Sequence, residues 1–266
     1  QTPSGATESK SSKKSGSLPS WAIKRLTKTG LLNTLIRMHE NDGPWIAIVS
    51  DIHGNIDALK AVWEDMAGYA VEKVFCLGDI VGYGPEPAEC VQSIINLCDA
   101  SVLGNHEAMF SLSQQILEED WEAAIGRPLQ LANEQLNQDQ RIWLANLPMS
   151  KKSGSKILCH ASLHEPTEFH YIEDNNSATA HFSHQNTFVS FHGHTHVPVI
   201  WEYAPKKSEC LLHWSSENPI KLKKQKRYAI NCGSVGQPRD ENNKASFALL
   251  DSETKVVHIR RLEYDI

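Results

Sequence analysis

Ile46-Ala-Ile-Val-Ser-Asp51-Ile-His53-Gly-Asn55 is the stretch around which the whole chain is organised. It is an apolar run that ends in an acidic residue and a histidine, followed by a Gly-Asn pair that suits a turn. Four further motifs follow comparable apolar runs, and in chain order they are Leu77-Gly-Asp79, Gly104-Asn-His-Glu107, Cys159-His160 and Gly193-His-Thr-His196. Strands that end in such side chains can bring them together at the carboxyl edge of one sheet, where open α/β folds bind ligands.

Each motif also has a simpler structural explanation when it is taken alone. Asp51 could shape a turn or cap the next helix, and Asn105 could cap a helix start. His194 and His196 can converge at a strand end only if the backbone turns, which Gly193 permits. The occurrence of all five motifs in one order favours a metal site. Three oxygen donors with at least four imidazoles suit divalent transition metals better than calcium or magnesium alone.

Length and charge limit the partners that the protein can have. The chain has 266 residues, 40% of them hydrophobic, so it can bury a substantial core as one domain. Residues 1–28 hold six Lys or Arg and one Glu, a net +5, so the rest of the chain carries −11 against the total of −6. An acidic body is poorly suited to gripping long nucleic acid, which depends on neutralising many phosphates.

Cysteine usage and hydropathy indicate the compartment. The six cysteines are scattered and form no Cys-x-x-Cys pair, so we expect reduced, buried thiols. No stretch approaches the roughly 20 apolar residues that span a membrane, and no charged-then-apolar leader opens the sequence. The expected location is the cytoplasm, without membrane attachment, and the oligomeric state is unknown.

Composition and periodicity predict the organisation of the chain. Residues 1–20 are rich in Ser, Gly and Lys and are predicted to be a disordered tail. Residues 21–40 show apolar positions at helical spacing and are predicted to be a helical extension. Residues 45–266 form the main domain, with a helical insertion at 110–147 that Pro128 is expected to break and that could overhang the site.

Within the main domain, strands and helices are expected to alternate at first and strands to dominate later. Helices are predicted at about 56–69, 87–97 and 177–184. Strands are predicted at 45–49, 71–77, 101–103, 157–159, 188–191, 197–203, 209–213, 220–222, 228–231, 246–251 and 256–262. Two facing sheets, each covered by helices, would accommodate all of these elements.

The five motifs together resemble the signature of the calcineurin-like metallophosphoesterases, which is Asp-x-His, Gly-Asp, Gly-Asn-His-Asp/Glu, a lone His and Gly-His-x-His. The resemblance covers about residues 45–262. Gly78-Asp-Ile-Val-Gly-Tyr-Gly-Pro85 and Asn231-Cys-Gly-Ser-Val-Gly-Gln-Pro-Arg239 resemble the small bacterial phosphodiesterase branch, which includes dinucleoside polyphosphate hydrolases. The family resemblance implies an α/β fold, which is a four-layer α-β-β-α sandwich of two facing mixed sheets with a helical insertion.

Carried over motif by motif, the resemblance implies two metal sites. The first would be held by Asp51, His53 and His196. The second would be held by Asn105, His160 and His194, with Asp79 bridging both. Two divalent ions of Mn, Fe or Zn, about 3.5–4 Å apart, would share a hydroxide that attacks the phosphorus and would stabilise the entering and leaving oxygens.

Two further residues receive roles. The resemblance assigns His106 to protonating the leaving oxygen or stabilising its charge, which is worth roughly 10²–10⁴-fold. Arg239 could reach a substrate phosphate, although an exposed structural role is as plausible. Val81, Gly82 and Tyr83 replace the Asp and Arg of the Ser/Thr protein phosphatases, so phosphoprotein substrates are not expected. In the motif Asn231–Arg239, Cys232 stands where the small bacterial phosphodiesterase branch is expected to carry a Pro.

The predicted function is hydrolysis of a phosphodiester or phosphoanhydride of a small nucleotide. One alternative is a nuclease of the same superfamily, which the acidic body disfavours and the Lys-rich tail would favour. The other alternative is a non-catalytic scaffold that keeps the fold for protein binding. A scaffold would be expected to have lost ligands, whereas the complete set is present here.

Overall fold

The computed structural model describes residues 43–113, 123–214 and 218–265. The predicted tail at 1–20 and the helical extension at 21–40 lie outside these residues. The division into tail, extension and main domain therefore stays a prediction.

One sheet combines the start and the end of the described chain. Its strand order is β3-β2-β1-β11-β12-β9. The first three strands run parallel, and β11 pairs antiparallel with β1, so that Ile46 lies opposite Leu250. The strands in this order are Ala100–Ser101, Val71–Cys76, Trp45–Val49, Ala245–Asp251, Val256–Leu262 and Ile220–Lys221.

The other sheet is built from the middle of the chain in the order β4-β5-β6-β10-β7-β8. Strands β5, β6 and β10 run parallel, and the remaining neighbours pair antiparallel. The strands in this order are Ser150–Ser153, Lys156–Cys159, Val189–His192, Arg227–Asn231, Val199–Ala204 and Glu209–Trp214. Both sheets are therefore mixed, as expected.

Three buried cores define four layers. Side chains alternate along a strand, so Ile46 and Ile48 of β1 face the core between the sheets, whereas Ala47 and Val49 face an outer core. The inner core also takes Phe191 of β6, and a second outer core lies between α7 and the other sheet. The order helix, sheet, sheet, helix confirms the predicted four-layer sandwich.

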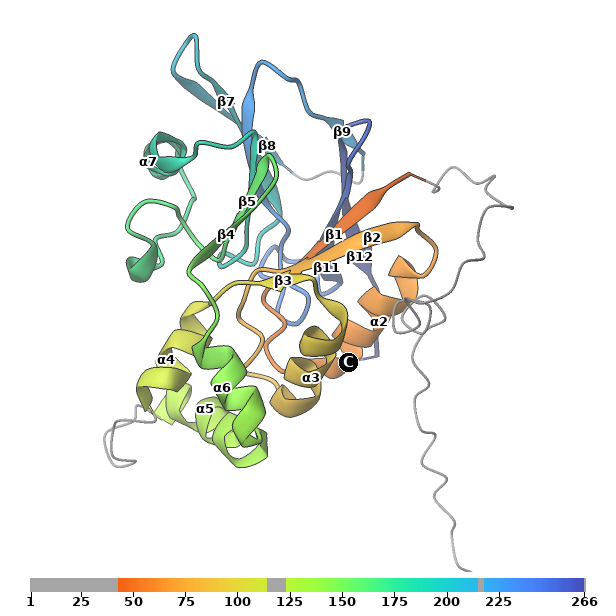
Figure 1. The fold of residues 1–266 in the computed structure, drawn as a ribbon, viewed down its shortest axis with the longest axis vertical. Coiled ribbons are helices and arrows are strands. Elements are labelled where there is room, and N and C mark those ends of the chain that lie inside the picture. Colours follow the sequence, from red (N-terminus) through yellow and green to blue (C-terminus); the bar gives the residue numbers. More distant parts are fainter. Residues whose placement is uncertain (1–42, 114–122, 215–217, 266) are drawn as a thin grey trace, which may run out of the picture.

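The helices cover the outer faces. Helices α2 (Ile56–Met66) and α3 (Pro87–Leu97) lie on the first sheet, and α7 (Asn175–His184) lies beside the second, on the opposite side of the molecule (Figure 1). Helices α4 (Asn105–Ser113), α5 (Ala123–Gln135) and α6 (Gln138–Ala145) extend the first outer core at one end.

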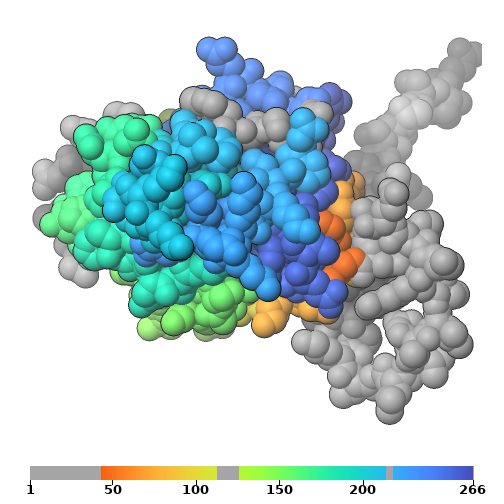
Figure 2. Space-filling model, turned by 90° about the horizontal axis from the view of Figure 1, so that it is seen from above, coloured from red at the N-terminus to blue at the C-terminus, as the bar shows by residue number. Residues whose placement is uncertain are grey.

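The two halves of the chain close against each other. Seen from above, the cyan and blue segments of the second half form a continuous surface that adjoins the dark blue C-terminal strands and the orange first strand (Figure 2). This agrees with the pairing of β1 with β11. Among the described helices, none has the length and apolar content to cross a membrane. No disulfide joins the six cysteines, all of which fall within the described residues.

Three local expectations differ from the structure. Strand β4 was not expected, because Ser-Lys-Lys-Ser carries no apolar alternation; it forms as an exposed edge strand paired with β5. Helix α5 continues through Pro128 and is not broken there. Helix α2 ends at Met66, where Ala67 and Gly68 donate to carbonyls of the last turn.

Candidate metal centre

Five loops that follow strands of both sheets place the candidate ligands together. Asp51 and His53 follow β1, and Asp79 follows β2. The next ligands come from the start of α4 after β3, from the loop after β5 and from the loop after β6. They are Asn105, His160, His194 and His196.

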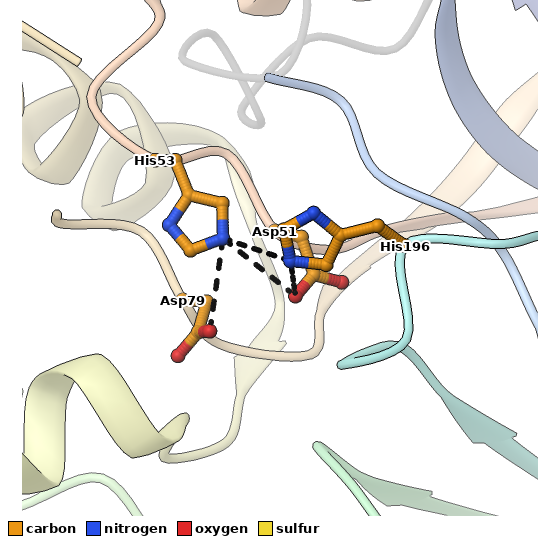
Figure 3. A group of neighbouring side chains, drawn as sticks. All are labelled: Asp51, His53, Asp79 and His196. Atoms are coloured by element: carbon orange, nitrogen blue, oxygen red, sulfur yellow. Dashed lines mark hydrogen bonds and ion pairs between the residues drawn. The ribbon is translucent and has the colours of Figure 1, made fainter. Parts of the chain in front are cut away.

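One group consists of Asp51, His53, Asp79 and His196, all buried, with ligand atoms within 4.8 Å of one another. The Nε2 atoms of His53 and His196 lie 3.1 Å apart. Carboxylate oxygens of Asp51 and Asp79 lie 3.3 Å from His196 Nε2 and 3.7 Å from His53 Nε2, respectively. The two rings and the two carboxylates point toward one centre (Figure 3).

The second group shares Asp79 with the first. Asp79, His160 and His194 have ligand atoms within 4.8 Å of one another. His160 Nε2 lies 3.3 Å from Asp79 Oδ2, 3.2 Å from His194 Nδ1 and 3.1 Å from the amide oxygen of Asn105. The structure therefore brings all seven candidate ligands into two adjoining groups with Asp79 between them.

The outer nitrogens of three imidazoles are bonded to backbone carbonyls, and this fixes their tautomers. Nδ1 of His53 contacts the Val81 carbonyl at 3.2 Å, Nδ1 of His160 contacts the Leu77 carbonyl at 2.8 Å, and Nδ1 of His196 contacts a further carbonyl, that of Gln237. A carbonyl only accepts, so Nδ1 carries the proton in neutral imidazole and Nε2 presents a lone pair.

His53 and His196 direct Nε2 atoms at each other across 3.1 Å, so that one cation beside them could be bound by both rings. Fixing a ligand histidine through its other nitrogen is the usual arrangement at a protein metal site. The donor set therefore fits divalent transition ions in both groups.

The ligand loops require an unusual backbone. Five of the seven candidate ligands have left-handed backbone conformation, with φ of 53° at Asp51, 49° at His53, 50° at Asp79, 68° at His194 and 61° at His196. Non-glycine residues rarely adopt this region, and such strain clusters at functional sites.

Gly193 has a different role from the one expected. The turn between the two histidines is made by their own positive φ angles, and Gly193 itself is not in the left-handed region. A Cβ at Gly193 would overlap the side chains of Ser50 and Asp51. The glycine is therefore needed for close approach between β6 and the loop after β1.

Charge and burial set different protonation states for the ligands. Burial lowers the pKa of His53 to about 3 and that of His194 to about 4, so both are neutral at pH 7. Burial also disfavours the charged form of His160, but the carboxylates of Asp79 and Asp51 raise its pKa to about 9. Burial opposes ionisation of Asp79, yet His160 holds the pKa of Asp79 well below its ordinary value.

Glu107 supports the centre and was not among the predicted site residues. Its fully buried carboxylate accepts four backbone N–H groups: those of Asp79 at 2.8 Å, Ile80 at 2.7 Å, Val81 at 3.0 Å and Gly104 at 3.0 Å. Burial and Asp79 raise its pKa to about 7, against the opposing effect of these N–H donors. Its place in the Gly-Asn-His-Glu motif was the available signal.

His106 lies beside the groups without belonging to either. Its Nε2 is 4.0 Å from Asp79 Oδ2, and its ring lies 4.8 Å from those of His53 and Tyr83. Its backbone N–H donates to the other Asp79 oxygen at 2.9 Å, and burial lowers the pKa of the imidazole. A Cβ at Gly82 would overlap this ring, so the glycine leaves room for it.

Arg239 is exposed, and its backbone N–H donates to the carbonyl of His196 at 3.5 Å. Its guanidinium donates to the side chain of Gln237 at 2.8 Å, and the carbonyl of Gln237 holds His196. His192, in contrast, is buried in β6 outside both groups, and its Nδ1 contacts the Asn231 amide at 3.3 Å. A role for Arg239 in phosphate binding stays a prediction.

Comparison with known proteins places this architecture in a family. The family model for the calcineurin-like phosphoesterase superfamily domain matches residues 45–255. A protein described as uncharacterised, from Methanocaldococcus jannaschii, is 37% identical over 226 residues, which cover 83% of this chain and 88% of the relative.

Solved structures give the same result. A metallophosphoesterase from Sphaerobacter thermophilus superposes with a TM-score of 0.74 at 34% identity, covering 84% of this chain and 90% of that one. A hypothetical protein from Pyrococcus horikoshii shares the fold, with a TM-score of 0.65 at 22% identity over 83% of this chain and 88% of that one. The chain, whose strand ends gather the family's motif residues, belongs to the calcineurin-like phosphoesterase superfamily.

Proposed function

We propose that the protein is a dinuclear metal-dependent phosphoesterase that hydrolyses a phosphodiester or phosphoanhydride of a small nucleotide. Asp51, His53 and His196 would hold one ion, and Asn105, His160 and His194 the other, with Asp79 between them. The observation that carries the proposal is the sharing of Asp79 by two adjoining groups whose imidazole nitrogens face one another.

The bound ions would supply Lewis acidity, which activates water near neutral pH and neutralises phosphate charge. The chain's own contribution is positioning. Glu107 fixes the backbone from Asp79 to Val81 through three of its hydrogen bonds, so the carboxylate of Asp79 is held between the two groups. His106, whose Nε2 lies 4.0 Å from that carboxylate, would donate a proton to the leaving oxygen.

Two exposed aromatic rings favour a nucleotide as the substrate. Tyr83 is 45% exposed and lies 4.8 Å from the His53 ring, beside the first group. Tyr171 is 44% exposed and lies 4.3 Å from the His194 ring, beside the second group. Exposed aromatic faces next to a phosphate site are suited to stacking on a base, which contributes about 1–3 kcal/mol per base.

The acidic body favours small substrates over polynucleotides. Outside residues 1–28 the formal charge is −11, given the +5 of that segment and the total of −6. Binding of long nucleic acid depends on many Lys and Arg contacts to phosphate. A nuclease would act on single-stranded or duplex DNA, and a scaffold would turn over nothing, so one substrate panel separates the three functions.

The test is metal-dependent turnover of bis(p-nitrophenyl) phosphate, followed by a panel of cyclic nucleotides, dinucleoside polyphosphates, mononucleotides and DNA with added Mn²⁺. We expect activity on the small diesters or anhydrides and its loss in Asp79→Asn. Asp57→Asn is the matched control, because Asp57 is an exposed helix residue paired with Lys60. Inactivity of a metal-loaded sample toward every ester would refute the proposal.

A further inference from the structure

A third group of potential metal ligands lies outside the catalytic region. It consists of His164, Glu165 and His170, whose ligand atoms lie within 4.8 Å of one another. Nε2 of His170 is 3.1 Å and Nε2 of His164 is 3.6 Å from the same oxygen of Glu165. The two imidazole rings are stacked, with centroids 5.7 Å apart and 21° between their planes. Two imidazoles and one carboxylate form a donor set suited to zinc.

The loop that carries these residues is closed by its own hydrogen bonds. The Ser162 N–H donates to the His170 carbonyl at 3.2 Å, which joins the two ends of the loop. The His164 N–H donates to the Ser162 hydroxyl at 3.1 Å. The Leu163 N–H donates to Nδ1 of His181, a buried residue of α7, at 3.1 Å. The donors are therefore held close together by the backbone before any ion binds.

The backbone of this loop has two left-handed positions. Glu165 has a φ of 46° and precedes the short 3₁₀ turn Pro166–Glu168, and Phe169 follows the turn with a φ of 49°. Such left-handed positions in non-glycine residues are sustained only where the surroundings hold them. The Nε2 atoms of His164 and His170, which face the same oxygen of Glu165, are the atoms that would bind an ion.

The same loop touches the catalytic region. Phe169 and Tyr171 flank His170 in sequence, and the Phe169 ring lies 6.0 Å from that of His160 and 6.2 Å from that of His194. The Tyr171 ring lies 4.3 Å from that of His194. An ion held by this loop would therefore restrain the aromatic residues that pack on two candidate ligands of the second group.

We propose that His164, Glu165 and His170 form a third, partly exposed zinc site that fixes the loop of residues 162–172 against the catalytic region. The site offers three protein ligands, so the remaining coordination positions are open to water. A third imidazole, that of His184, lies 5.2 Å from the His164 ring by centroid distance, although it is outside the ligand group. The proposal does not depend on catalytic activity.

The first test measures zinc stoichiometry. The full chain is stripped of metal and titrated with Zn²⁺ against a chromophoric chelator, in wild type and in a His164→Ala/His170→Ala double variant. We expect the wild type to bind one equivalent more than the double variant, and each single variant to weaken that equivalent at least about tenfold. His213→Ala is the control, because its imidazole lies 3.5 Å from a single carboxylate, that of Glu202, and should cost no equivalent.

Two further measurements locate the ion and its effect. Anomalous diffraction at the zinc edge should show a peak between His164, Glu165 and His170. Hydrogen exchange of the peptide covering residues 162–172 should slow on zinc addition in wild type and stay unchanged in the double variant. Equal stoichiometry in both proteins, or an anomalous peak confined to the catalytic groups, would overturn the proposal. Because the replaced side chains are partly exposed, unchanged circular dichroism is the check on folding.

Discussion

Replacing Glu107 by glutamine tests whether one buried carboxylate organises the centre. Each of its oxygens accepts two backbone N–H groups: Oε1 those of Ile80 and Val81, and Oε2 those of Asp79 and Gly104. Glutamine has the same shape but keeps only one accepting oxygen. Its NH₂ group would face two buried N–H donors, which therefore lose their acceptor.

The size of the effect follows from those two donors. A buried polar group left without a partner costs about 1–3 kcal/mol, so Glu107→Gln is expected to destabilise the fold by about 2–6 kcal/mol. Removing a carboxylate whose pKa burial has raised to about 7 offsets part of this loss, which favours the lower half of the range. For a domain of this size, 1 kcal/mol corresponds to roughly 2–4 °C, so a loss of about 2–4 kcal/mol should lower the midpoint by roughly 4–16 °C.

Thermal unfolding and metal titration are the assays. The metal-free variant should melt earlier, and its affinity for Mn²⁺ should fall about 10–100-fold, because the backbone of Asp79 is no longer fixed. Glu64→Gln makes the same chemical change on the exposed face of α2 and should leave both quantities unchanged. A variant of Glu107 that melts within about 1 °C of wild type and binds metal equally would refute the reasoning.

Three other perturbations have defined outcomes. His106→Asn should keep metal content, measured by elemental analysis, while lowering kcat by at least about two orders of magnitude for a poor leaving group; unchanged turnover would remove its role as acid. In metal-free protein, the pKa of His160 is raised from 6.5 to about 9. The pairing of protonated His160 with Asp79 therefore stabilises the fold fully below pH 6.5, and this stabilisation is lost as the pH rises through about 9. The melting temperature should decline over that interval in wild type and stay level in His160→Gln. Tyr171→Ala or Tyr83→Ala should raise KM for a nucleotide about tenfold with little change in kcat, because each removes a ring that could stack on the base. Tyr171→Phe and Tyr83→Phe keep the ring and should leave KM unchanged. The same KM in all four variants would argue against stacking.

The sequence, with the family resemblance, was sufficient to predict the layers of the fold. The strands at 45–49 and 256–262 and the helix at 87–97 have the predicted bounds. A continuous apolar run marks the first strand, and a proline marks the start of the helix. The motif residues, which the resemblance had grouped into two sites, do lie in two adjoining groups. Their role as ligands remains a proposal.

Other features depend on contacts that no local pattern encodes. Asp51 and His53 have left-handed backbone conformations that their local sequence does not predict. The carbonyls that orient three imidazoles come from distant residues, and Leu77 lies 83 positions before His160. Strand β4 forms because a neighbouring strand offers pairing, and its own composition gives no sign of it. Tertiary context decides each of these.

The pairing of β1 with β11 has a consequence for synthesis on the ribosome. Ile46 is paired with Leu250, and the backbone around Asp51 is held by residues beyond position 230: the Ser234 hydroxyl and the Gly236 N–H both donate to its carbonyl. The nascent chain must therefore emerge at least as far as Gly236 before its first ligand loop is locked. Contacts of such long range fold slowly, so the newly made protein is exposed to misfolding until β11 has been made.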